Sequence, residues 1–69
     1  MTTLIVGNLP YSVREEEIRP LFEGFGIGSV RIIEGKGIAF IDVQHPAEAI
    51  AGTWDAQVRG RKLRARLAD

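Results

Sequence analysis

The chain has 69 residues, of which 45% are hydrophobic and 26% charged, and its formal net charge is zero. A chain of this length forms only one modest core, because about 60 residues bury only about 60% of their unfolded surface, so a deep cleft between two domains is excluded. The absence of cysteine excludes disulfides, thiolate metal sites and thiol redox chemistry. We therefore expect a single domain, residues 1–69, that is held together by hydrophobic packing and needs no cofactor.

The first third of the chain predicts a strand and then a helix. Residues 2–6 are apolar and β-branched, and turn residues follow at 7–10, which is typical of a strand that leaves into a loop. This run is far too short for a signal peptide or a membrane span, so we expect a cytoplasmic protein, or a nuclear one in a eukaryote, with no membrane partner. From Glu15 to about Glu23, apolar residues recur every three or four positions, which indicates a short amphipathic helix that contains Pro20.

Residues 30–33 and 38–43 predict a β-hairpin. With Gly35-Lys36 as a two-residue turn, paired residue numbers sum to 71, so that Arg31 lies opposite Phe40 and Ile33 opposite Ile38. Side chains alternate between the two faces of a strand. The core face then carries Val30, Ile32, Ala39, Ile41 and Val43, and the other face carries Arg31, Ile33, Ile38, Phe40 and Asp42.

A second helix and a last strand complete the chain. Pro46 suits the first turn of a helix, where its missing N–H costs nothing, and the helical spacing predicts a buried face made of Ala47, Ile50, Ala51 and Trp54. Residues 62–67 alternate strictly between basic and apolar side chains, which predicts a strand with one basic face. The order strand, helix, strand, strand, helix, strand indicates a two-layer α+β fold with both helices on one face of an antiparallel sheet.

The zero net charge conceals a gradient along the chain. Residues 1–55 carry four basic and eight acidic side chains, a net charge of −4, whereas residues 56–69 carry five basic side chains and one acidic side chain, a net charge of +4. Such an asymmetry indicates a directional electrostatic surface.

Several segments of the chain resemble the RNA recognition motif family. Residues 4–9, LIVGNL, are similar to its first-strand motif, and residues 36–43, KGIAFIDV, to its third-strand octamer. Residues 21–26 and 60–63 also resemble the end of its first helix and the entry into its last strand. The resemblance covers nearly the whole chain, and it implies a ferredoxin-like βαββαβ sandwich whose four-stranded antiparallel sheet has the first and third strands at its centre.

The resemblance also implies binding of single-stranded RNA, or of single-stranded DNA in its place, on the open face of the sheet. In this family, aromatic rings stack on bases while cations contact phosphates. The three stacking positions fall on Ile5, Ile38 and Phe40, of which only Phe40 is aromatic. Because stacking contributes about 1–3 kcal/mol per base, we expect weak to moderate affinity. The further candidate RNA-binding residues are Asn8 of the first-strand motif and the cations Arg31, Lys36, Arg64 and Arg66.

Two other classes of function, protein association and catalysis, compete with RNA binding. Ile5, Ile33, Ile38 and Phe40 together make an apolar patch that would suit a protein partner or a homodimer. Catalysis is not expected, because small acyl-phosphate hydrolases of this architecture need an arginine in the loop after the first strand, and residues 7–11 contain none. A metal site is not expected either, because the single His45 has no cysteine or second histidine near it.

Overall fold

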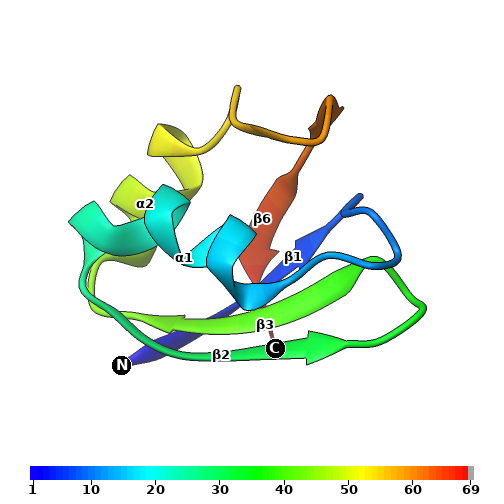
Figure 1. Cartoon of the computed structure of the whole chain (residues 1–69). Helices are drawn as coiled ribbons and strands as arrows, with labels where there is room; N and C mark the ends of the chain where they lie inside the picture. Colours follow the sequence, from blue (N-terminus) through cyan, green and yellow to red (C-terminus); the bar gives the residue numbers. More distant parts are fainter. Residues whose placement is uncertain (69) are drawn as a thin grey trace.

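The computed structural model describes residues 1–68, and it has two layers (Figure 1). Four antiparallel strands form the main sheet in the order β2-β3-β1-β6, and helices α1 and α2 lie together on one of its faces (Figure 1). The elements are β1 Thr2–Gly7, α1 Glu15–Phe22, the 3₁₀ helix η1 Glu23–Phe25, β2 Ile27–Ile33, β3 Ile38–Val43, α2 Pro46–Gly52, β4 Gln57–Val58, β5 Arg61–Lys62 and β6 Arg64–Leu67. This arrangement confirms the expected fold class, with β1 and β3 at the centre of the sheet.

The core lies between the sheet and the two helices. Its buried apolar side chains, among the described residues, are Leu4, Val6, Leu9, Val13, Ile18, Phe22, Ala39, Ile41, Val43, Ala49, Val58 and Leu63. On β1 and β3 they are alternate residues, as a sheet with one covered face requires. Burying a side chain of the size of leucine or phenylalanine stabilises the fold by about 1.5–3 kcal/mol. The opposite face of the sheet is left open for other contacts.

Helix α1 is short, as its sequence predicts. The Glu17 carboxylate accepts a hydrogen bond from the backbone N–H of Arg14 over 3.0 Å, which satisfies one of the donors left unpaired at a helix start. After one turn of 3₁₀ helix the chain reaches Gly26, whose φ of 73° is left-handed. Such a residue commonly ends a helix, and glycine adopts it without a steric penalty. Neither α1 nor any other helix of residues 1–68 has the length and apolar character needed to cross a membrane.

The hairpin of β2 and β3 has the expected register, but its turn lies elsewhere. Arg31 is opposite Phe40 and Ile33 is opposite Ile38. The predicted turn at Gly35-Lys36 is wrong by one residue, because the backbone N–H of Lys36 donates to the carbonyl of Ile33 over 3.3 Å. That bond centres the turn on residues 34–35, with the left-handed Gly35 (φ 74°) as its third residue. The predicted register is nevertheless correct, because residues 34–37 connect Ile33 to Ile38 whichever pair of them forms the turn.

The predicted buried face of the second helix is wrong except at Ile50, which is half-buried against the core. α2 ends at Gly52, and the side chains that it and its C-cap bury are Ala49 and Thr53. Trp54 follows the helix and is 57% exposed. A helix of only two turns has few residues, so its sequence alone does not fix which of its faces packs against the sheet.

The predicted continuous strand over residues 62–67 is also wrong. Lys62 belongs to β5, which pairs with β4 in a separate hairpin where Gln57 is opposite Lys62. Leu63 is buried, and its backbone N–H donates to the carbonyl of Ala56 over 3.2 Å. Only from Arg64 onward does the chain pair with β1. The basic alternation therefore spans the end of the small β4–β5 hairpin and a strand of the main sheet, which have different surroundings.

Candidate nucleic-acid interface

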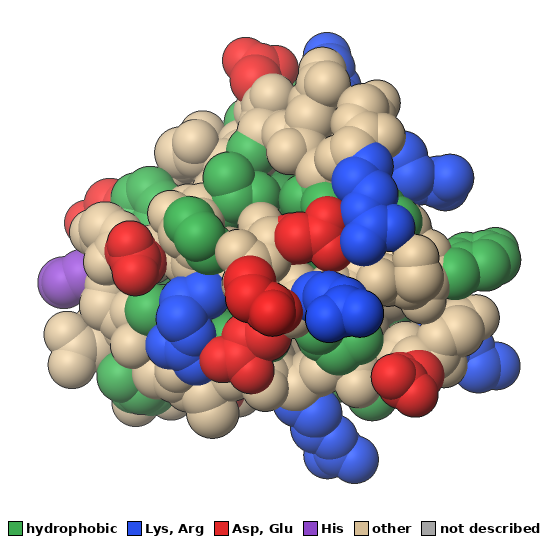
Figure 2. Space-filling model, in the orientation of Figure 1, with side chains coloured by type: hydrophobic (Ala, Val, Ile, Leu, Met, Phe, Trp, Pro, Cys, Tyr) green, Lys and Arg blue, Asp and Glu red, His purple; other side chains and the backbone are tan. Residues whose placement is uncertain are grey.

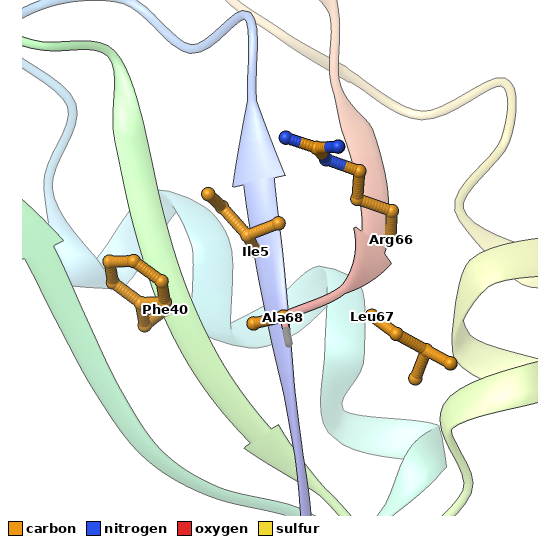
Figure 3. A pocket seen from close by; sticks show the side chains of 5 residues that line it. All are labelled: Ile5, Phe40, Arg66, Leu67 and Ala68. Atoms are coloured by element: carbon orange, nitrogen blue, oxygen red, sulfur yellow. The ribbon is translucent and has the colours of Figure 1, made fainter.

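One row of four side chains crosses the open face of the sheet. Arg31 of β2 is opposite Phe40 of β3, Phe40 is opposite Ile5 of β1, and Ile5 is opposite Arg66 of β6. Side chains directly opposite each other on one face are about 4.5–5.5 Å apart at Cβ. Figure 3 shows three members of this row, with Ile5 between Phe40 and Arg66. The row thus has an apolar centre and a guanidinium group at each end.

The ring of Phe40 borders two hollows on this face. The first is lined by Ile5, Phe40, Arg66, Leu67 and Ala68 (Figure 3). The second is lined by Phe40 together with Thr3, Ser29, Arg31 and Asp42. A half-buried ring with space on both sides is suited to stacking on an unpaired base.

Asp42 is the acidic side chain of the second hollow. The Thr3 hydroxyl donates to its Oδ1 over 2.5 Å, and the Ser29 hydroxyl donates to its Oδ2 over 2.7 Å. These hydrogen bonds, that of Thr3 first, hold the pKa of Asp42 below its ordinary value of 3.8, so the carboxylate is charged at neutral pH. The alternation of β3 places Asp42 on the open face, but sequence reasoning did not include it among the candidate site residues.

Three further predicted residues lie beside the row. Ile33 and Ile38 are opposite each other and half-buried, and by strand alternation they share the face of Phe40. They extend the apolar centre of the row, so the four residues of the predicted apolar patch are together on one face. Lys36 is exposed in the turn of the same hairpin, at the rim of this patch.

Arg64 and Asn8, two other predicted site residues, contact the protein itself. The Arg64 Cζ lies 5.0 Å from the centre of the Trp54 ring, so its side chain is held over an aromatic that follows α2. Asn8 has a left-handed φ of 61°. Its Nδ2 donates to the carbonyl of Lys62 over 2.7 Å, and its Oδ1 accepts from Arg61 over 3.2 Å. Neither side chain belongs to the row, and a direct contact of either with RNA stays a prediction.

A salt bridge between Arg59 and Glu17 lies on the helical side of the protein, and no local sequence pattern predicted it. Arg59 donates to both carboxylate oxygens of Glu17 over 2.7 Å and to the Ser12 hydroxyl over 2.8 Å. The hydrogen bond from Arg59 holds the pKa of Glu17 below its ordinary value of 4.5. Figure 2 shows acidic and basic side chains close together on this side, over α1. The acidic helix therefore lies on the layer away from the row.

An open sheet backed by two helices, with an aromatic residue on its central third strand and arginines beside it, defines an RNA recognition motif domain. A sequence profile of the RNA recognition motif matches residues 4–53, and the chain belongs to this family. Among curated proteins it is similar to the splicing factor, proline- and glutamine-rich, of Homo sapiens and Mus musculus, at 44% identity over 69 residues. That alignment covers 94% of this chain but only 10% of the relative.

Solved structures give the same family. RNA binding protein PG1 superposes with a TM-score of 0.84 at 31% identity, covering 99% of this chain and 94% of the other. The Caenorhabditis elegans NONO-1 homodimer superposes with a TM-score of 0.74 at 36% identity, over 99% of this chain and 29% of that one. The SXL-lethal protein/RNA complex superposes with a TM-score of 0.80 at 26% identity, over 97% and 47%. The family resemblance drawn from the sequence motifs is thus confirmed.

Proposed function

We propose that this chain binds single-stranded RNA, with weak to moderate affinity, through the open face of the sheet. The observation that carries the proposal is the row in which Phe40 and Ile5 lie between Arg31 and Arg66. Phe40 provides a stacking surface, and the arginines provide cations that contact phosphate or stack in turn. The similarity to PG1 and to the SXL-lethal protein/RNA complex supports RNA as the ligand.

The surroundings of the row favour a single strand over a duplex. Stacking on Phe40 requires a base that is not already stacked and paired, which a loop or a single strand offers. The short turn at residues 34–37 brings Lys36 to the rim but is too short to wrap around a ligand. We therefore expect a footprint of a few nucleotides, with single-stranded DNA as a weaker alternative ligand.

Titration of the ¹⁵N-labelled chain with short single-stranded RNAs at low salt tests the proposal. Amide shifts should concentrate on β1, β3 and the ends of the row, while those of α1 should stay unchanged. The same sequence as DNA measures the contribution of the 2′-hydroxyl, and an RNA duplex is the negative control. A sheet face whose amides do not respond to any of these RNAs would refute the proposal.

The proposed role is binding without catalysis. Membership in the RNA recognition motif family supports it, since a domain of this kind acts through its exposed face rather than through an enclosed site. The similarity to a splicing factor favours the nucleus, of the two compartments expected, if the source is a eukaryote.

A second candidate function is association with a protein, including another copy of the chain, through Ile5, Ile33, Ile38 and Phe40. These side chains form the apolar centre of an otherwise uncovered face, and the similar NONO-1 structure is a homodimer, of which this chain spans 29%. Sedimentation velocity across a wide range of concentrations should then show a dimer that Ile38→Asp disperses. A strict monomer at every concentration would refute self-association.

A further inference from the structure

The second hollow beside Phe40 is built from three strands. Asp42 of β3 is opposite Thr3 of β1, and both lie on the open face, two residues along their strands from Phe40 and Ile5. Ser29 comes from the irregular stretch of β2 between Ile27 and Val30. Such an irregularity re-aims a side chain, and here it brings the Ser29 hydroxyl within 2.7 Å of the carboxylate.

The polar groups around Asp42 leave this wall of the hollow with acceptors only. A hydroxyl has one proton to donate, and the Thr3 and Ser29 hydroxyls both donate theirs to Asp42. A carboxylate has about four lone-pair sites, so about two remain for a ligand. Within the part of the chain that the structure describes, Asp42 forms no salt bridge, and the N-terminal ammonium group is the nearby cation that helps to lower its pKa. Its negative charge also repels phosphate, which directs a nucleic-acid backbone elsewhere on the face.

A charged acceptor beside a stacking ring recognises the donors on the edge of a base. Guanine offers two adjacent donors, N1–H and the N2 amine, which match the two oxygens of a carboxylate. Cytosine and adenine each offer one exocyclic amine, and carboxylates accept hydrogen bonds from the cytosine amine. Uracil offers only N3–H, between two carbonyl oxygens that would face the carboxylate. Arg31, which lines the same hollow, supplies a donor for guanine O6.

We propose that Asp42 selects the base that stacks on Phe40, favouring guanine, then cytosine and adenine, over uracil. This inference rests on the proposed RNA binding and assigns a base preference to the same face. The contact is made through the base edge, while the phosphates lie toward Arg66 at the far end of the row. Asp42 is thus a specificity-determining residue.

The test measures the affinity of the whole chain for hexauridylate and for hexamers in which one central uridine is replaced. Cytidine should raise the affinity several-fold and guanosine roughly tenfold, because a good two-point pair discriminates by about 1–3 kcal/mol. Inosine, which differs from guanosine by the missing N2 amine, should lose most of that gain. Asp42→Asn converts one acceptor into a donor, so it should reduce the preference over uridine to less than twofold.

A matched control separates base recognition from simple charge. Glu34→Gln removes the same charge at the exposed hairpin turn, and it should raise the affinity for all four hexamers alike and keep their order. If Asp42→Asn has that same uniform effect, Asp42 is only a repulsive charge and the inference is overturned. If Asp42→Asn does not fold, Ser29→Ala still tests the inference. It leaves Asp42 charged and frees one of its lone pairs, so the order of the four affinities should be kept. If no hexamer binds the folded chain, RNA binding itself is refuted.

Discussion

Two arginine-bearing regions of this protein differ in what their guanidinium groups contact. On the open sheet face, Arg31 and Arg66 form no salt bridge or side-chain hydrogen bond with any other residue in the range 1–68. On the hairpin of β4 and β5, Arg59 donates to Glu17 and Ser12 over 2.7 to 2.8 Å. The first region leaves its charge available to a ligand, and the second uses it to attach the hairpin to the start of α1.

The difference shows that the basic C-terminal segment is not one binding surface. Its net charge of +4 over residues 56–69 suggests a single cationic patch. In the fold, Arg59 and Arg61 are hydrogen-bonded to the protein, and Arg64 is held over Trp54. Arg66 alone of these four joins the row across the sheet. A charge count along the sequence therefore overstates the cations that face a nucleic acid.

The largest expected effect comes from removing the stacking ring on the sheet face. Phe40→Ala should weaken RNA binding roughly ten- to a hundredfold, because base stacking on an aromatic side chain contributes about 1–3 kcal/mol. Fluorescence anisotropy with a labelled short RNA measures the change. Trp54→Ala is the control, since that ring is exposed but lies beside Arg64, and it should leave the affinity within twofold. Equal losses in the two variants would contradict the assignment of the face.

Asn8 is hydrogen-bonded to Lys62 and Arg61 of β5, so its substitution tests the hairpin region of the comparison. Asn8→Ala removes two side-chain hydrogen bonds and replaces asparagine, which tolerates a left-handed φ of 61°, by alanine, which tolerates it less, so the free energy of unfolding should fall by about 1–2 kcal/mol. Urea unfolding measures this loss, and Asn8→Gly, which relieves the backbone, should lose less. The RNA affinity of the folded variant separates the two roles. An unchanged affinity assigns Asn8 to the scaffold alone, and a loss of affinity shows that Asn8 contacts RNA as the sequence predicts.

The two arginine regions should also differ in their effect on the salt dependence of binding. Each phosphate contact on a single strand contributes about 0.7 to the slope of log K against log salt. Arg66→Ala, which removes the cation on the phosphate side, should therefore lower the slope by about 0.7, which amounts to roughly 2.6-fold between 50 and 200 mM salt. Arg59→Ala removes a cation that is paired with Glu17 and should leave the slope unchanged. Equal slopes in the two variants would contradict the assignment of phosphate contacts to the sheet face rather than to the β4–β5 hairpin.

The smallest effect concerns acid stability on the hairpin side. Because the pKa of Glu17 is lowered in the fold, its ion pair stabilises the protein above the ordinary value of 4.5 and loses that contribution as the pH falls below it. Glu17→Gln should lower the Tm at pH 7 by a few degrees and make it fall less steeply between pH 5 and pH 3. Glu16→Gln, at the exposed neighbouring position, is the matched control and should follow the unchanged chain.

The elements that the sequence predicted well are those in which local alternation and tertiary burial agree. On β3, the buried residues Ala39, Ile41 and Val43 alternate with residues of the open face, so the pattern alone indicated which side chains are buried. The register with β2 was also correct, because the misplaced turn lies within the same connection between Ile33 and Ile38. The short helix α2 was misjudged because its few apolar residues permit more than one buried face. Trp54 was expected in the core and is exposed, because the helix ends before it. Its ring lies beside Arg64 instead of against the core.

By itself, the sequence determined the order of the two helices and of the four strands of the main sheet, the face of the hairpin on which Phe40 and Arg31 lie, and the family. These features follow from motifs and from the spacing of apolar residues over short stretches of sequence. In a strand or a helix, that spacing decides which side chains share a face. Only the tertiary structure decided which charged side chains remain available, because their partners are remote: Arg59 pairs with Glu17 across 42 positions, and Asp42 accepts from Thr3 across 39. Such contacts depend on the packing of whole elements against one another, which no local pattern encodes.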